Sequence, residues 1–118
     1  MKKTIHLIIL LTILFGACEK VSEQDELPVS YEIRKGIYVP GTNGYNIYPR
    51  PFNNQVNFDL EGSNVNLLLS DESGRAKNIE LKNNSSIRVD FSKCKVGVYY
   101  CEITLDGVVY RERLWKNQ

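Results

Sequence analysis

Few residues of this chain could carry chemistry: three cysteines, one histidine, and scattered acidic, tyrosine and arginine side chains. The histidine, His6, lies in an apolar leader. A chain without that leader has no histidine, which excludes Ser/His/Asp and Cys/His catalysis of the usual kind and histidine-ligated zinc. Asp71 and Glu72 fall short of the about six to eight oxygen ligands that calcium takes. We therefore expect no catalytic residues, no metal site and no cofactor.

The leader, residues 1–17, has the layout of a secretory signal peptide. Two lysines precede a short apolar run over residues 5–15, well under the roughly 20 residues of a transmembrane helix. The following Gly16-Ala17-Cys18 resembles the lipobox of bacterial lipoproteins, with Phe15 where leucine is usual. This resemblance implies cleavage before Cys18 and lipid on its thiol and new amino group. The alternative is an ordinary secretory signal with an incidental cysteine.

Residues 18–30 are predicted to hold the lipidated Cys18 and an acidic linker. The linker has too few apolar residues to pack, so we expect a mobile tether. Glu23, Asp25 and Glu26 resemble a signal that sends some lipoproteins to the outer face of the outer membrane. The alternative is that these acidic residues only keep the tether solvated.

The remaining residues, 31–118, suffice for one domain with a single two-layer core. The 15 basic and 14 acidic side chains of the whole chain nearly cancel. Nucleic acid is therefore not an expected partner, because it would require a strong basic patch. Membrane attachment would come from the lipid on Cys18.

A period of two dominates the apolar pattern from Tyr31 onward, and no stretch carries a helical stripe. Short strands at this spacing, separated by turns, predict an all-β fold, an antiparallel β-sandwich of about seven strands. The Asp106-Gly107 pair favours a tight hairpin between the last two strands. The expected extended segments lie near residues 33–38, 45–48, 56–61, 65–71, 79–81, 87–91, 98–105 and 108–115.

The most specific pattern outside the leader is Gly97-Val98-Tyr99-Tyr100-Cys101. Its spacing resembles the tyrosine corner of immunoglobulin-like domains, which implies a hydrogen bond from the Tyr99 hydroxyl back to the backbone. Alternation then places Tyr99, Cys101, Ile103 and Leu105 inward. The absence of a central tryptophan sets the chain apart from antibody-type domains, so we expect immunoglobulin-like topology only.

Four segments of the chain resemble the C-terminal sorting domains of type IX secretion cargo: residues 46–52, residues 55–58, the Asp71–Gly74 hairpin and the glycine-x-tyrosine corner. Arg50 replaces the usual asparagine. The chain is also similar to small, uncharacterised bacterial lipoproteins built on one immunoglobulin-like or fibronectin-like domain. The lipoproteins are the better match, because a sorting domain normally follows a large cargo protein. Both resemblances imply the same fold, but a shared fold does not fix function.

Cys94 and Cys101 have two readings. Outside the cytoplasm a pair of cysteines invites a disulfide, provided that the glycine corner brings their Cα atoms within about 7 Å. The alternative is that both are small buried hydrophobes, as free cysteines often are.

Two groups of residues are candidates for ligand binding. Tyr38, Tyr45 and Tyr48 lie among turns rich in asparagine, and suit sugar rings; the alternative is that they cap the open end of the sandwich. Arg111, Arg113 and Trp115 alternate on one face of the last strand, where they could grip an acidic glycan or a protein partner. The alternative is a solvated edge whose charges discourage aggregation.

These observations favour a non-enzymatic, lipid-anchored binding module at the outer membrane, at the cell surface, with an unknown protein or glycan ligand. A structural or assembly factor that faces the periplasm and recognises a protein is the second hypothesis. For the first hypothesis, the last strand offers an edge for β-augmentation.

Overall fold

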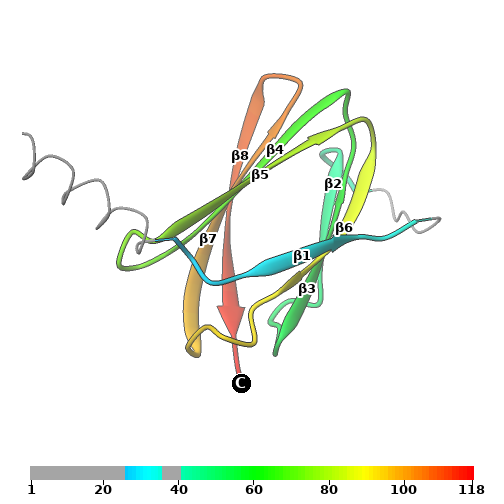
Figure 1. The fold of residues 1–118 in the computed structure, drawn as a ribbon. Helices are drawn as coiled ribbons and strands as arrows, with labels where there is room; N and C mark the ends of the chain where they lie inside the picture. The colour runs from blue at the N-terminus through cyan, green and yellow to red at the C-terminus, as the bar shows by residue number, and fades with distance from the viewer. Residues whose placement is uncertain (1–25, 36–40) are drawn as a thin grey trace, which may run out of the picture.

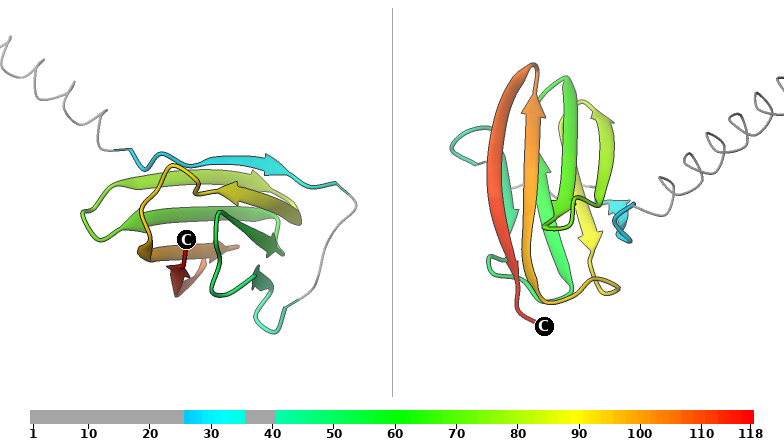
Figure 2. Two further views of the ribbon diagram at one scale, coloured as in Figure 1. Left: turned by 90° about the horizontal axis from the view of Figure 1, so that it is seen from below. Right: turned by 90° about the vertical axis from the view of Figure 1, so that its left-hand side faces the viewer.

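The computed structural model describes residues 26–35 and 41–118. Within these ranges the protein is all-β, and no helix among them could cross a membrane. The eight strands of the described residues, in line with the eight expected extended segments, form two packed four-stranded sheets (Figures 1 and 2). The strands are β1 (Ser30–Ile33), β2 (Tyr45–Tyr48), β3 (Gln55–Leu60), β4 (Asn64–Asp71), β5 (Ala76–Lys82), β6 (Ser85–Asp90), β7 (Gly97–Leu105) and β8 (Val108–Lys116).

The strand order confirms an immunoglobulin-like sandwich. One sheet runs β1-β6-β3-β2 and the other β5-β4-β7-β8, and every pairing between neighbouring strands is antiparallel. The chain crosses from one sheet to the other between β3 and β4, between β5 and β6, and between β6 and β7. These crossings bury the inner faces of both sheets against each other, as the alternating sequence requires.

Strand β7 runs through the centre of the second sheet and shows the predicted alternation. Tyr99, Cys101, Ile103 and Leu105 are all buried. They pack into one core cluster that also holds Phe58 from the opposite sheet. The inward face assigned to this strand from its sequence is therefore confirmed.

The tyrosine corner is present as its resemblance implied. The Tyr99 hydroxyl donates a hydrogen bond of 2.5 Å to the carbonyl oxygen of Lys95. Gly97 starts the strand at φ 145, a backbone conformation that residues with a side chain rarely adopt. The Tyr99 ring meets the Phe91 ring edge-on at 5.1 Å between centroids. This one side chain therefore ties the loop before β7 to the core.

The hairpin between β7 and β8 is the tight turn that Asp106-Gly107 predicts. Both residues have positive φ, 47 for Asp106 and 89 for Gly107, as a type I′ turn needs. The Asp106 carboxylate also accepts hydrogen bonds from the backbone N–H groups of Ser63 and Asn64. The turn sets a register in which Tyr100 lies opposite Arg113.

The end of the predicted linker is part of the domain, which corrects the boundary at residue 31. Leu27 is 1% exposed and belongs to the core cluster. Its N–H donates to the carbonyl of Ala76 in β5, and Glu26 forms an ion pair with Lys77. Leu27 and the half-buried Val29 are the apolar anchors in a mostly polar run, so composition alone predicted a mobile tether. Cys18 and the rest of the linker lie outside the described residues.

We call residues 26–34 the strap, because they run from one sheet to the other. The strap starts beside Ala76 in β5, and its β1 segment then pairs with β6 in the other sheet. The first strand therefore lies at Ser30–Ile33, earlier than the expected segment near 33–38. The strap covers one side of the sandwich.

Leu27→Ala should lower the free energy of unfolding by about 2–5 kcal/mol, because it removes a buried side chain and leaves a cavity. Urea unfolding of the chain from residue 18 onward, with Cys18→Ala, measures this. Ile33→Ala is the matched control: Ile33 is 60% exposed, and its loss should cost within about 0.5 kcal/mol. Equal effects of the two substitutions would contradict a structural role for the strap.

Tyr99→Phe should cost about 1 kcal/mol of stability, since it removes only the hydroxyl that reaches Lys95. Tyr100→Phe, one residue along on the exposed face, is expected to change nothing in the same urea titration. An unchanged unfolding midpoint for Tyr99→Phe would show that the corner hydrogen bond does not stabilise the domain.

Candidate binding surface

The outer face of the β5-β4-β7-β8 sheet carries a surface whose residues line up by strand register. Ser70 on β4, Tyr100 on β7 and Arg113 on β8 form one row across the strands. Leu68, Glu102 and Arg111 form the next row. Since successive residues of a strand point to opposite faces, all six side chains lie on the face turned away from the core.

Tyr100, Arg113 and Trp115 form what we call the aromatic–arginine cluster. Tyr100 is 40% exposed and Trp115 is 53% exposed. Trp115 follows Arg113 by two residues on the same face of β8, a spacing of about 7 Å. The carbonyls of Arg113 and Trp115 accept hydrogen bonds from Arg50 and Phe52, on the side of β8 away from β7. Tyr100 and Arg113 therefore face each other as a non-hydrogen-bonded pair, in which side chains are closest.

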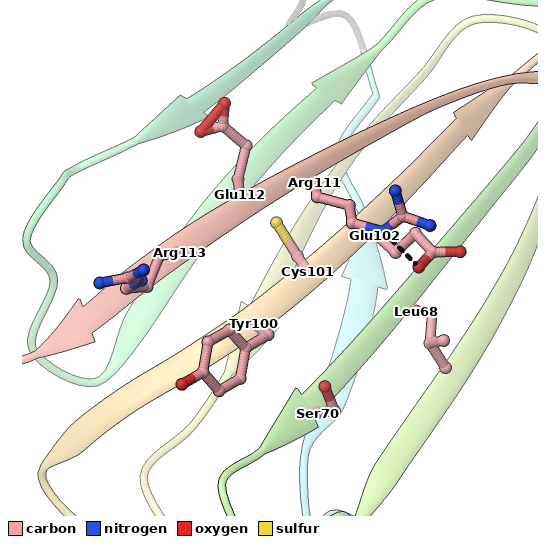
Figure 3. Close-up of a pocket in the computed structure, with 8 residues that line it drawn as sticks. All are labelled: Leu68, Ser70, Tyr100, Cys101, Glu102, Arg111, Glu112 and Arg113. Atoms are coloured by element: carbon pink, nitrogen blue, oxygen red, sulfur yellow. Dashed lines mark hydrogen bonds and ion pairs between the residues drawn. The ribbon is translucent and has the colours of Figure 1, made fainter.

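A hollow of 260 Å³ lies over these rows (Figure 3). Tyr100 and Ser70 lie at one end and the ion-paired Arg111 and Glu102 at the other, with Leu68 beside Glu102. The Arg111–Glu102 pair has an N–O distance of 3.2 Å. Within the described ranges, the Arg113 guanidinium has no such carboxylate partner. The hollow thus offers one uncompensated cation beside an aromatic ring, and a neutral polar end.

Tyr45 lies elsewhere, between β2 and β8. Its hydroxyl donates to Glu112 over 2.8 Å, and its ring is 5.1 Å from that of Tyr110. Burial, followed by the hydrogen bond and negative charge of Glu112, raises the pKa of Tyr45. Arg50 reaches the same carboxylate over 3.1 Å. These contacts close the open side of the sandwich, as the alternative expected.

Tyr48 points to the outer face of the other sheet. Its hydroxyl donates to Asp59 over 2.8 Å and accepts from the Arg34 guanidinium over 2.9 Å. Asp59 is fully buried and also accepts from the Ser86 hydroxyl. This network fixes the second end of the strap to the sheet. The structure therefore does not bring Tyr45 and Tyr48 into one stacking site, and Tyr38 lies outside the described residues.

Cys94 and Cys101 are both buried and both free, so the bridge left open by the sequence is not formed. Burial raises the pKa of the Cys101 thiol to about 12. Burial also raises the pKa of Cys94, whose Sγ lies 3.8 Å from the carbonyl oxygen of Pro28 in the strap. Both residues thus occupy the place of small buried hydrophobes, as the alternative stated.

No group of three or more histidine, cysteine, aspartate or glutamate residues, among those that the structure describes, is arranged to hold a metal ion. Of the ligand-binding candidates, only Arg111, Arg113 and Trp115 come together. The sequence analysis missed Tyr100, Ser70 and Leu68 as members of the same surface. The hairpin turn held the missing signal for Tyr100, because a two-residue turn at Asp106-Gly107 already pairs it with Arg113.

Comparison with known proteins supports the resemblance to secretion sorting domains. The family described as "Secretion system C-terminal sorting domain" matches residues 46–117, more than half of the chain. The match covers nearly all of β2 and every later strand, whereas the strap precedes it. No curated protein matches the chain.

Thiol titration checks the state of the two cysteines. In the chain with Cys18→Ala we expect no reaction with a disulfide reagent such as DTNB at pH 8, because both thiols are buried with raised pKa values and stay protonated there. Unfolding in guanidinium should release both thiols. Rapid labelling of the native protein would refute their burial, and unreactive unfolded protein would reveal a disulfide.

Proposed function

Since this chain belongs to the family of secretion system C-terminal sorting domains, we propose that it is a non-enzymatic, lipid-anchored binding module of the cell envelope. Cys18 is the anchor, and the outer face of the β5-β4-β7-β8 sheet binds the partner at the outer membrane surface. The family ties the chain to secretion and the envelope. The leader ending in Gly16-Ala17-Cys18 supports the anchor.

The aromatic–arginine cluster is the observation that supports binding. Tyrosine, tryptophan and arginine are the residues that dominate recognition surfaces, because each combines a large contact area with a polar end. Trp115, the largest of these side chains, is 53% exposed. Exposed aromatic side chains around an arginine that lacks a carboxylate partner favour a partner with an acidic group.

A second candidate is a periplasm-facing structural or assembly factor that recognises a protein. The open edge of β8 favours it. The backbone groups of Val109 and Arg111 point away from β7, and Arg50 and Phe52 cover only the last part of this edge, from Arg113 onward. An extended peptide adds a strand to such an edge.

Protease shaving of intact cells, probed with an antibody against the folded domain, separates the two candidates. We expect the signal to disappear on intact cells for the natural chain. The Cys18→Ala variant should leave the membrane fraction, since one lipid anchor is all that holds the chain there. Protection until the outer membrane is broken would contradict surface display and favour the periplasm-facing candidate. Membrane retention of Cys18→Ala would contradict the lipid anchor.

A further inference from the structure

We propose that the aromatic–arginine cluster is a subsite for a carboxylated sugar, such as a uronic acid residue within a glycan. This inference rests on the proposed function only in taking the outer face of the β5-β4-β7-β8 sheet as the binding face. It adds the chemical class of the ligand and a role for each side chain.

Arg113 is the group that recognises the carboxylate. Its planar guanidinium offers parallel N–H donors that match a carboxylate, a geometry that lysine does not reproduce. The other arginine on this face, Arg111, is already engaged by Glu102 at 3.2 Å. Arg113 is therefore the cation available to an incoming anion.

Tyr100 and Trp115 supply the apolar contact. Both rings are exposed, on either side of Arg113: one across the strand pair and the other two residues along β8. A sugar ring has an apolar face that packs on an aromatic plane, while the tyrosine hydroxyl and the indole N–H remain able to hydrogen-bond. Covering the arginine with a ring also lowers the local dielectric, which strengthens its pairing with a carboxylate.

The polar groups of the hollow suit hydroxyl groups. Ser70, in the same row as Tyr100 and Arg113, offers a hydroxyl that both donates and accepts, and Glu102, at the other end, offers acceptor oxygens while its charge is balanced by Arg111. One cation next to a neutral polar end fits a ligand with a single carboxylate and neighbouring hydroxyls. A run of acidic peptide side chains would instead bring a second carboxylate toward Glu102, which costs free energy.

Trp115 provides the readout, because it is the single tryptophan of the chain. The chain from residue 18 onward, with Cys18→Ala, would be titrated with oligogalacturonate and, in parallel, with a malto-oligosaccharide of equal length and with hexaglutamate. We expect a saturable change in tryptophan emission with oligogalacturonate only. Titration calorimetry would confirm the affinity independently of the fluorophore.

Substitutions assign the roles. Arg113→Gln should weaken oligogalacturonate binding about tenfold or more, because it removes a charge-assisted contact. Arg113→Lys should restore only part of it, and Tyr100→Ala and Trp115→Ala should each weaken it as measured by calorimetry. Lys82→Gln is the matched control: it removes one positive charge from the outer face of the same sheet, on the far strand β5, with an expected change below about threefold. All four positions are exposed on the outer face, and urea midpoints would verify that each variant folds.

The outcomes separate this inference from the proposed function. Equal binding of the neutral oligosaccharide, or equal loss in Lys82→Gln and Arg113→Gln, would overturn the carboxylate subsite. Hexaglutamate binding with the same dependence on Arg113 would overturn the sugar and assign the face to an acidic peptide. No binding of oligogalacturonate by a folded, surface-exposed chain would overturn the inference and leave the anchored module intact. Binding by a chain that shaving places in the periplasm would support the inference and overturn the location.

Discussion

The register of the β7–β8 hairpin is the constraint on which the rest of the structure depends. The Asp106-Gly107 turn fixes this register, since the positive φ values at both residues match the twist of the two strands. A slip of one residue would turn the inward set of β8 to solvent and bury its outward set. The same pairing that keeps Leu114 in the core therefore holds Arg113 and Trp115 outside. One turn therefore determines both which β8 side chains enter the core and which form the candidate surface.

The sides of the sandwich explain why one face remains available. The strap covers the side of β5 and β6 and is fixed at both ends, by Leu27 in the core and by Arg34 on Tyr48. On the opposite side, Tyr45 packs on Tyr110 and the Phe52 backbone pairs with the end of β8. The outer face of the β5-β4-β7-β8 sheet has no comparable cover from the residues that the structure describes. Tyr100 and Trp115 of the aromatic–arginine cluster are among the large exposed side chains on this face.

Regular strands were predictable from sequence because a strand that is buried on one face has apolar residues at every second position. Strand β7 and its inward face followed from this pattern, whereas its glycine corner followed from the resemblance to the tyrosine corner. The strap did not, because its four β1 residues are all exposed and its apolar anchors, Leu27 and the half-buried Val29, are few in a polar run. Tyr45 and Tyr48 are three residues apart on one strand, so alternation already favoured opposite faces of their sheet over one shared stacking site.

Part of the candidate surface could likewise be predicted from the sequence, and part could not. Arg111, Arg113 and Trp115 share a strand, so alternation alone placed them together. Tyr100 lies on the neighbouring strand and required the hairpin register, while Ser70 and Leu68 required the pairing of β4 with β7, strands far apart in sequence. Contacts between distant segments leave no local pattern in one sequence. The free state of Cys94 and Cys101 also depends on such packing, here against the strap and within the core.

The central claim is that this chain binds a carboxylated sugar through the outer face of the β5-β4-β7-β8 sheet. A nitrogen–proton correlation NMR titration of the ¹⁵N-labelled chain with oligogalacturonate tests it most directly, because every backbone amide and the single indole report separately. The account predicts that shifts concentrate on the Trp115 indole and on the amides of Ser70, Tyr100 and Arg113. Shifts that instead gather around Tyr45 or Tyr48, or that are absent at millimolar ligand, would contradict it.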